Sequence, residues 1–588
     1  MSRLEKLKSI KSRSALAMLL GFTPAALAFV LFKIPYEQKY RHFTIAKRGG
    51  GEREINAPMP QLKLLQARLA ELLYECIKEL EMVQPNRTRV THGFQLGRSI
   101  ITNAEQHRQR RYVLNLDLED FFGSINFGRV RGFFHKDVSF ELAEPVATTI
   151  AQIACWQNKL PQGSPCSPVI SNLIGHIMDI RLLRLAKATK CRYTRYADDI
   201  SFSTNACDFP SALAVRNADA LHIWTLSDTL ESAIQRAGFA VNHTKTRMQI
   251  KGSRQEATGL IVNEKVNVKA EYARQTRAMC HHLFSKGVYV LPAPVGETEK
   301  PDPTSNLAPL EGRLSHIHLV KNRTDLSVNE KKVREFKPPK SPAKLYGRFL
   351  FYKHFVAANC PVLVTEGPSD IIYLRIGLRA RGEFFPRLCP NKNNSKFGFR
   401  FLNPSETLKE LLDLGNGTSG IGKLIGSYKA RLKKFEHKPL LSPVILIVDN
   451  DKGAKSVFDP ANKMLNDIDP EASKISLDSE DSWHYLGENL YLIKIPHGGA
   501  KASRVIEDLL PSEWLETELN GKKFDPKKPH GDHNAFSKIA FAKGVIRANA
   551  AQIDFTKFDQ LFTLIDSAIQ HYAGIRAASQ QALLKKSA

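Results

Sequence analysis

Cysteine pairs with metal-binding spacing are absent from the sequence. Its eight cysteines are scattered over 588 residues, and no two of them have the C-x-x-C spacing of a zinc site. Zinc ribbons and nuclease motifs built on such pairs are therefore excluded. Free buried thiols in a reduced compartment account for these cysteines most simply, so we expect a cytoplasmic protein.

Acidic residues are in short supply. The chain carries 59 aspartates and glutamates against 85 lysines and arginines, which gives a formal net charge of +26. We expect a polyanionic partner, because basic side chains that contact phosphates release condensed counterions. Hydrophobic residues make up 43% of the chain and charged residues 24%, a globular balance that excludes wholesale disorder. The length predicts about two to four domains.

The sequence also lacks an uninterrupted apolar run of membrane-spanning length. The nearest candidate, Ala15–Phe32, follows basic residues and superficially resembles a signal peptide or a membrane helix. Gly21 and Pro24 interrupt it, Lys33 leads into polar sequence, and no small-residue cleavage site follows. We therefore expect two short buried helices that meet at residues 21–24, and no membrane partner.

Three aspartates in the first half of the chain are predicted to meet. Tyr112–Leu118 is a short apolar strand that delivers Asp117 at its end. Alternating residues flank Ala197–Asp199 on both sides, which is typical of a β-hairpin with Asp198 and Asp199 at its tip. Adjacent carboxylates repel one another unless a cation neutralises them. Two divalent metal ions about 4 Å apart would do so, and such pairs suit phosphoryl transfer.

A second α/β region begins near Tyr346 and carries acidic residues of its own. Its two most apolar stretches, Pro361–Thr365 and Pro443–Val448, are predicted strands, and each ends in acidic residues. Glu366 follows the first strand, and an Asp-x-Asp pair at residues 449 and 451 follows the second. Parallel sheets place ligand sites at the carboxyl ends of their strands, so these acids are expected to converge.

The first group of residues resembles the motifs of reverse transcriptases, in the order found in that family. Besides the Tyr-Ala-Asp-Asp box at 196–199, the matching segments are Phe43–Pro58 of the fingers, Leu160–Pro165 beside the incoming nucleotide, and Asn242–Thr246 of the palm. The resemblance implies template-directed DNA synthesis at a triad held by two Mg²⁺ ions: Asp117, Asp198 and Asp199. It also implies substrate contacts by Lys47, Arg53, Gln162, Lys245 and Phe122, the last of which would exclude a ribose 2′-hydroxyl.

Within this family, the sequence is most similar to the bacterial retron enzymes. Asn103–His107 has the N-A-x-x-H pattern of their specific insertion, and Ala257–Gly259 stands where they have Val-Thr-Gly. The resemblance implies RNA recognition by Asn103, His107, Thr258 and Gly259. Group II intron enzymes are the nearest alternative, but no maturase-like region follows the motifs.

The retron resemblance also implies a set of partners. Retron enzymes prime DNA synthesis from an internal guanosine 2′-hydroxyl of their own structured non-coding RNA. The implied partners are therefore this RNA, deoxynucleoside triphosphates and the branched RNA–DNA product, multicopy single-stranded DNA, in a bacterial cytoplasm. A homo-oligomer is left open.

The second acidic centre resembles the Toprim domain of topoisomerases, primases and overcoming-lysogenization-defect nucleases. The resemblance implies that Mg²⁺ or Mn²⁺ is held by Glu366, Asp449 and Asp451, with Asp370 as a ligand of the nuclease branch. Further candidate ligands are Glu507 and Asp508, and Lys538 or Lys543 could neutralise transition-state charge.

The Toprim resemblance leaves two readings of the C-terminal half. A nuclease needs no other domain, whereas strand passage needs a tyrosine nucleophile domain. We therefore expect a nuclease effector fused to the polymerase and acting in phage defence. The alternative is a non-catalytic module that binds the RNA–DNA product.

The expected fold class is multidomain, α+β followed by α/β. The sequence between Pro292 and Pro342 is rich in proline, lysine and glutamate, and it predicts linkers around a small helix, Leu310–Val320. The expected boundaries are 1–263 for the fingers and palm of a right-hand polymerase, 264–325 for a thumb-like helical region, 326–345 for a linker, 346–515 for a Toprim-like domain and 516–588 for a C-terminal helical region.

Overall fold

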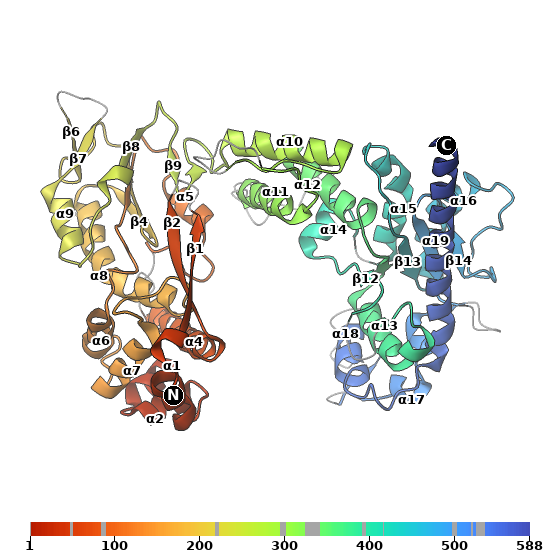
Figure 1. Cartoon of the computed structure of the whole chain (residues 1–588), viewed down its shortest axis with the longest axis horizontal. Helices are drawn as coiled ribbons and strands as arrows, with labels where there is room; N and C mark the ends of the chain where they lie inside the picture. Colours follow the sequence, from red (N-terminus) through yellow and green to blue (C-terminus); the bar gives the residue numbers. More distant parts are fainter. Residues whose placement is uncertain are drawn as a thin grey trace. The chain divides into compact units, whose positions relative to one another are not determined.

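A computed structural model describes residues 2–46, 51–83, 90–217, 223–293, 301–323, 341–390, 396–415, 417–496, 503–518, 521–524 and 535–587. The chain divides into two compact units (Figure 1). The first unit consists of Met1–Arg274, Pro292–Lys300 and Leu319–Val333, and the second unit consists of Gln275–Leu291, Pro301–His318 and Arg334–Ala588.

The first unit is organised around a four-stranded antiparallel sheet in the order β4-β5-β3-β8. Apolar side chains of this sheet share one hydrophobic core with those of the long helices α4 and α8. The elements are α1 (Arg3–Ser9), α2 (Arg13–Leu19), α3 (Pro24–Ala28), η1 (Phe29–Lys33), η2 (Tyr36–Gln38), β1 (Tyr40–Ala46), β2 (Glu52–Pro58), α4 (Pro60–Val83), α5 (Ile100–Gln106), β3 (Tyr112–Asp117), α6 (Phe127–Lys136), α7 (Glu144–Ala154), α8 (Ser167–Ala188), β4 (Arg192–Tyr196), β5 (Asp199–Thr204), β6 (Ala214–Arg216), β7 (Trp224–Leu226), α9 (Asp228–Gln235), η3 (His243–Lys245), β8 (Arg247–Ile250), β9 (Glu256–Ala257) and β10 (Leu260–Ile261).

The N-terminal apolar run forms two short helical arms, as predicted. Arg13–Leu19 and Pro24–Lys33 meet at a bend of 107°, where Gly21 adopts a φ of +79° and Pro24 opens the second arm. No single helix among the described residues is long and apolar enough to cross a membrane, and these arms reach that hydropathy only when they are taken together.

The second unit is a five-stranded sheet with helices on both faces (Figure 1). In the order β12-β11-β13-β15-β14, the first four strands are parallel and the edge strand β14 is antiparallel. Val444 and Leu446 of β13 share a core with α15 and α16, whereas Ile445 and Ile447 share another core with α13 and α19. Burial on both faces explains why this strand is apolar at every position.

The elements from Ala270 onward are α10 (Ala270–Lys286), α11 (Leu307–Arg323), α12 (Ser341–Phe351), η4 (Tyr352–Val356), β11 (Val362–Thr365), α13 (Pro368–Arg381), η5 (Gly382–Phe384), β12 (Arg400–Phe401), α14 (Glu406–Leu412), α15 (Thr418–Leu432), β13 (Val444–Val448), η6 (Lys452–Ala454), α16 (Lys455–Asn466), β14 (Trp483–Tyr485), β15 (Leu490–Lys494), η7 (Ile506–Leu509), α17 (Ser512–Leu515), β16 (Lys523–Phe524), β17 (Ala535–Phe536), α18 (Lys538–Phe541), η8 (Ala542–Ile546), η9 (Thr556–Phe558) and α19 (Asp559–Ser587).

The predicted helix at Leu310–Val320 is confirmed as part of α11. In the expected linker, 326–345, the last five residues open α12, and residues 326–340 lie outside the described part of the chain. The remaining domain boundaries stay predictions.

Candidate active sites

Strand pairing brings together the three aspartates of the first unit. Asp117 is the last residue of β3 and Asp199 is the first residue of β5, and the two are direct partners in the antiparallel register. Asp198 lies in the two-residue turn between β4 and β5, and its carbonyl accepts a hydrogen bond from the amide of Leu118 at 3.1 Å. The predicted hairpin with adjacent aspartates at its tip is confirmed.

The carboxylates of this triad repel one another. Burial, and then the charges of Asp198 and Asp117, raise the pKa of Asp199 to about 7. Burial also raises the pKa of Asp198, and the nearby cations Lys245 and Arg53 oppose this effect. Lys245 Nζ donates a hydrogen bond to Asp117 Oδ1 at 2.8 Å. The side chain of Asp199 is exposed on one side, so a cation can reach the group.

Two more of the predicted nucleotide contacts lie on or against strand β2. Arg53 is exposed on β2, close enough to the triad to offset part of its repulsion. The amide of Asn56, also on β2, donates a hydrogen bond to the carbonyl of Gln162 at 2.8 Å. Gly163 adopts a φ of +118° and permits this approach, because a Cβ there would stand 2.8 Å from the carbonyl oxygen of Asn56. Lys47 lies outside the described residues.

Phe122 lies at the border of the core and the solvent. The half-buried ring is 5.9 Å from the ring of Phe94 and 5.5 Å from that of Phe121, and it packs against the hydrophobic core. Core packing therefore accounts for part of the position of this ring. Its selection of deoxynucleotides stays a prediction.

Two predicted RNA-recognition residues are buried in the structure, and their role in RNA recognition stays a prediction. Asn103 is 1% exposed and His107 is 0% exposed. The ring nitrogens of His107 are hydrogen-bonded to Ser203 Oγ at 2.8 Å and to Thr194 Oγ1 at 2.7 Å. Burial lowers the pKa of His107 to about 3, so the imidazole is neutral at physiological pH. His107 thus joins the end of α5 to strands β4 and β5 of the hairpin that carries Asp198 and Asp199.

The other two RNA-recognition candidates form the tight turn between β9 and β10. Thr258 is half-buried, and its hydroxyl donates a hydrogen bond to the carbonyl of Ile100 at 3.1 Å, at the start of α5. Gly259 is exposed and adopts a φ of +79°. The two retron-like motifs are therefore neighbours, and of their four candidate residues only this pair is open to a ligand.

The acidic residues of the second unit converge at the carboxyl ends of two adjacent parallel strands. Glu366 follows β11 and Asp449 follows β13. The amide of Asp449 donates a hydrogen bond to Glu366 Oε1 at 2.8 Å, which joins the two strand ends. Asp370, in the first turn of α13, accepts hydrogen bonds from the amide of Gly367 at 2.9 Å and from the hydroxyl of Ser369 at 3.1 Å. The predicted convergence is confirmed, and metal binding stays a prediction.

Glu507 and Lys538 belong to the same group, which is called the acidic cluster below. Glu507 is 1% exposed, and Lys538 Nζ lies 3.1 Å from its carboxylate. Burial, with the charges of Glu366, Asp370 and Glu507, raises the pKa of Asp449 to about 8, and Lys538 opposes the effect. Burial is also the main cause that raises the pKa of Glu366 to about 7 and that of Asp370 to about 6.

The remaining candidates of this region have other surroundings. The carboxylate of Asp451 accepts hydrogen bonds from two amides of η6, although its charge still raises the pKa of Glu366. The carboxylate of Asp508 accepts a hydrogen bond from the amide of Val505 and so caps η7. Lys543 is exposed on η8 and is not among the main causes of the pKa shifts in the acidic cluster. Lys538 is therefore the better placed of the two candidate lysines.

No three His, Cys, Asp or Glu side chains in the described part of the chain are arranged closely enough to hold a metal ion as they stand. In the first unit, Asp117 is hydrogen-bonded to Lys245. In the second unit, Asp449 Oδ1 accepts a hydrogen bond from the amide of Ile506 at 2.9 Å. Both groups nevertheless offer the oxygen donors that Mg²⁺ prefers, and a cation would remove the repulsion that raises their pKa values. The donor chemistry of both centres therefore fits a divalent cation.

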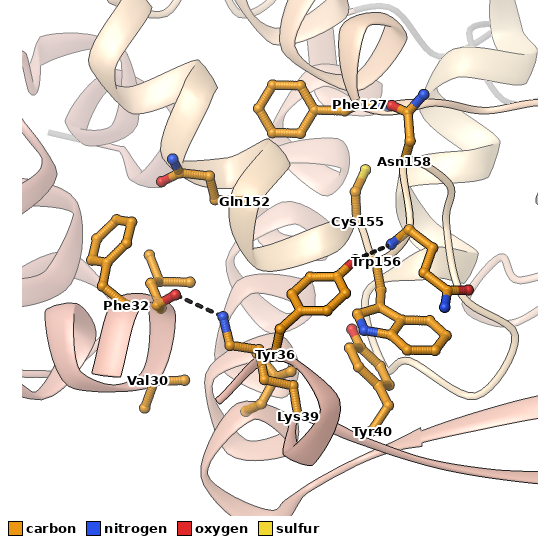
Figure 2. A pocket seen from close by; sticks show the side chains of 13 residues that line it. Val30, Phe32, Tyr36, Lys39, Tyr40, Phe127, Gln152, Cys155, Trp156 and Asn158 are labelled. Atoms are coloured by element: carbon orange, nitrogen blue, oxygen red, sulfur yellow. Dashed lines mark hydrogen bonds between the residues drawn. The ribbon is translucent and has the colours of Figure 1, made fainter. Parts of the chain in front are cut away.

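A pocket of about 310 Å³ lies in the first unit among the N-terminal helices and α7 (Figure 2). Gln152 Oε1 and Trp156 Nε1 have no hydrogen-bond partner, but other atoms of the protein cover them. The pocket is lined mainly by apolar and aromatic side chains, including Phe32, Tyr36, Tyr40 and Phe127. The residues of the two acidic centres do not line it.

A buried ion pair beside the hairpin that carries Asp198 and Asp199 was not predicted from the sequence. Arg195 Nε lies 2.8 Å from Asp179 Oδ1, and the two side chains are 0% and 1% exposed. Asp179 is the only acidic residue among the buried residues of α8. An acidic residue among the apolar residues of a long helix, together with an arginine directly before the Tyr-Ala-Asp-Asp box, was the signal that could have found the pair.

Comparison with known proteins identifies a family for residues of the first unit. Residues 45–272 match the family model for reverse transcriptase (RNA-dependent DNA polymerase). The retron Mx65 reverse transcriptase of Myxococcus xanthus is 32% identical over 53% of this chain and 68% of its own length. The retron Ec86 reverse transcriptase of Escherichia coli is 31% identical over 42% of this chain and 70% of its own length.

Among solved structures, the telomerase of Candida albicans in complex with a fragment of telomeric RNA is 11% identical, with a TM-score of 0.31, over 67% of this chain and 64% of that chain. This similarity is too weak to bear on function. The two retron enzymes, in contrast, match this chain at 32% and 31% identity over 68% and 70% of their own length. The chain therefore belongs to the retron reverse transcriptase family.

Proposed function

We propose that this protein synthesises a branched RNA–DNA hybrid from its own non-coding RNA, and that its second unit is a Toprim-like nuclease effector in anti-phage defence. The polymerase part is supported chiefly by one observation, the convergence of Asp117, Asp198 and Asp199 through strand pairing next to Lys245. Reverse transcriptases generally use Mg²⁺, in keeping with a carboxylate group whose charges are only partly neutralised.

In the polymerase reaction, each residue has a role that its position supports. The triad would hold Mg²⁺, which when bound supplies activation of the priming hydroxyl and neutralisation of the leaving pyrophosphate. Arg53 and Lys245 bind the triphosphate as cationic donors. Gln162 lies in a segment tied to β2, so it can orient the nucleotide between the fingers and the palm. Phe122 rejects a ribose 2′-hydroxyl.

The triad is tested by the double substitution Asp198→Asn and Asp199→Asn. We expect DNA synthesis on an RNA template to fall below detection, while RNA binding and the thermal unfolding curve stay close to those of the wild type. Asp208→Asn removes one negative charge from an exposed position after β5 and serves as the control. A double variant that makes wild-type amounts of complementary DNA would contradict the assignment.

The nuclease part is supported by the acidic cluster. Four carboxylates and one lysine gather at the carboxyl ends of β11 and β13, where parallel sheets bind ligands. Mg²⁺ or Mn²⁺, when bound there, supplies charge stabilisation for cleavage of a phosphodiester. Lys538 lies within reach of the cluster and would neutralise charge that develops on the phosphate.

The nuclease is tested by Glu366→Ala and Asp449→Ala. We expect both variants to lose metal-dependent cleavage of nucleic acid and phage protection, and to keep DNA synthesis, because the polymerase triad is in the other unit. Glu436→Ala removes a carboxylate of the second unit outside the cluster and serves as the control. If Glu366→Ala still cleaves nucleic acid and protects cells, the alternative replaces the nuclease: a non-catalytic module that binds the RNA–DNA product.

A further inference from the structure

The turn that carries the catalytic aspartates has an unfavourable backbone conformation. Ala197, its first residue, adopts a φ of +56°, in the left-handed region that favours glycine. The turn contains only two residues, since Tyr196 pairs directly with Asp199. A conformation of this kind persists only where the surroundings hold it in place.

The buried side chain of Arg195 is hydrogen-bonded to the turn. Its side chain is fully buried, and Nη1 donates hydrogen bonds to the carbonyl of Ala197 at 3.1 Å and to Asn172 Oδ1 at 3.2 Å. Nε and Nη2 each donate a hydrogen bond of 2.8 Å to a carboxylate oxygen of Asp179. The guanidinium group therefore connects helix α8 to the turn itself.

The surrounding residues fix the ion pair in turn. Asp179 accepts further hydrogen bonds from the hydroxyls of Tyr193 at 2.6 Å and Thr91 at 3.0 Å. Asn172 Nδ2 donates a hydrogen bond to the carbonyl of Gly93 at 2.6 Å. Both carboxylate oxygens thus have two or more donors, so the carboxylate has little freedom to rotate.

Two glycines make room for this arrangement. A Cβ on Gly93 would stand 2.4 Å from the backbone nitrogen of Ala197, so the 90–93 segment lies directly against the turn. A Cβ on Gly175 of α8 would stand 2.9 Å from Arg195 Nη2. The absence of a side chain at these two positions therefore allows the guanidinium group and the turn to pack closely against their neighbours.

We propose that Arg195, Asp179 and Asn172 are positioning residues that fix the turn between β4 and β5, and with it the geometry of the catalytic aspartates. This inference rests on the proposed polymerase function of the triad. Stability alone is a poor explanation for the pair, because apolar side chains of similar volume often stabilise a core as well as a buried ion pair does. The planar guanidinium group instead provides several donors in fixed directions, which a single ammonium group does not.

The test is Arg195→Lys, which keeps the buried positive charge but cannot reach the carboxylate, Asn172 and the turn carbonyl at once. Asn172→Ala is the second variant, because it leaves the ion pair intact and removes the link between Arg195 and Gly93. Gln66→Leu is the matched control. Gln66 is buried in the same core, where it donates hydrogen bonds to the hydroxyl of Tyr40 and to the carbonyl of Ile153, away from the turn.

We expect Arg195→Lys to lower kcat roughly tenfold or more, because small displacements of catalytic groups have large effects on rate. KM for deoxynucleotides should change less than about twofold, since the substrate-binding residues are untouched. Amide hydrogen exchange in peptides covering 113–118 and 192–200 should accelerate, because Leu118 is bonded to the turn. Asn172→Ala should show both effects to a smaller degree. Gln66→Leu should lose thermal stability without either effect.

The inference is overturned if folded Arg195→Lys and Asn172→Ala proteins have the kcat and the hydrogen exchange of Gln66→Leu at the same loss of thermal stability. The pair would then only connect α8 to the sheet. Absence of DNA synthesis by the wild-type protein would contradict the proposed function instead, and the exchange measurement would still decide the role of these residues.

Discussion

The substitution Asp449→Asn would remove one negative charge from the acidic cluster and keep the shape of the side chain. The asparagine oxygen can still accept the hydrogen bond from the amide of Ile506, and the amide of residue 449 can still donate to Glu366. We therefore expect Asp449→Asn to fold normally and to change only how the free energy of unfolding depends on pH and on Mg²⁺.

The sign of the pH effect follows from the direction of the pKa shift. The pKa of Asp449 rises from 3.8 to about 8 in the folded protein. Between these values the folded protein holds a proton that the unfolded chain has released. The free energy of unfolding of the metal-free wild type therefore falls as the pH rises through this window. The variant lacks this pH-dependent contribution. The free energies of unfolding of the two proteins should therefore differ little near the acidic end of this pH window and most above its alkaline end.

The magnitude follows from the same values. A pKa shift of about four units, at about 1.4 kcal/mol per unit, sets an upper limit near 6 kcal/mol on the effect of Asp449 on the free energy of unfolding. Glu366, Asp370 and Glu507 share the repulsion with Asp449, so we expect about 2 kcal/mol from Asp449 alone. Without metal at about pH 8.5, the variant should unfold roughly 4–8 °C higher than the wild type. Mg²⁺ should stabilise the wild type and have little effect on the variant.

Tryptophan fluorescence during heating is a suitable assay, because Trp483 and Trp514 both belong to the second unit. Scans at about pH 5 and about pH 8.5, with and without Mg²⁺, give the four conditions needed. Asp459→Asn, an exposed position on α16, is the control and should behave as the wild type. Equal stabilisation of the wild type and Asp449→Asn by Mg²⁺, or no gain for the variant at the higher pH, would refute the reasoning.

Three further outcomes are expected. Phe122→Ala should admit ribonucleotides into the product in assays with mixed nucleotides, and unchanged discrimination would leave the ring a core residue only. The purified protein should carry a covalently branched RNA–DNA molecule whose RNA is encoded nearby. If debranching treatment releases no nucleic acid and the bound RNA is heterogeneous, the protein does not make the retron product. His107→Leu should lower the free energy of unfolding by about 1–3 kcal/mol, because it leaves two buried hydroxyls without their partner, and should hardly change RNA affinity in a filter-binding assay. A large loss of affinity without a loss of stability would restore its role in recognition.

The sequence predicted those parts of the two centres that depend on local pattern. The hairpin at Asp198 and Asp199 follows from alternation on either side of the turn, and the convergence of Glu366 with Asp449 follows from two strands buried on both faces. In both cases the backbone places the acidic residue, so the order of residues along one strand was sufficient.

The contacts that were missed depend on partners far apart in the chain. His107 was assigned to RNA, yet its two hydrogen-bond partners are 87 and 96 residues away, and no local pattern indicates them. Glu507 and Lys538 could not be distinguished from surface charges, because only the packing of η7 and α18 shows that the glutamate is buried. Short motifs thus predict which element carries a residue. They do not predict whether the tertiary structure buries its side chain or exposes it.

The close approach of Gly93 to the catalytic turn also constrains how the family can vary. Any side chain at position 93 would overlap the backbone at Ala197, so substitution there requires the turn or the 90–93 segment to move. Relatives that carry a larger residue at this position should therefore have compensating changes in the turn or in its neighbours at positions 172 and 195. An alignment of retron enzymes should show this as covariation between a position outside the catalytic motifs and the residues that surround the Tyr-Ala-Asp-Asp box.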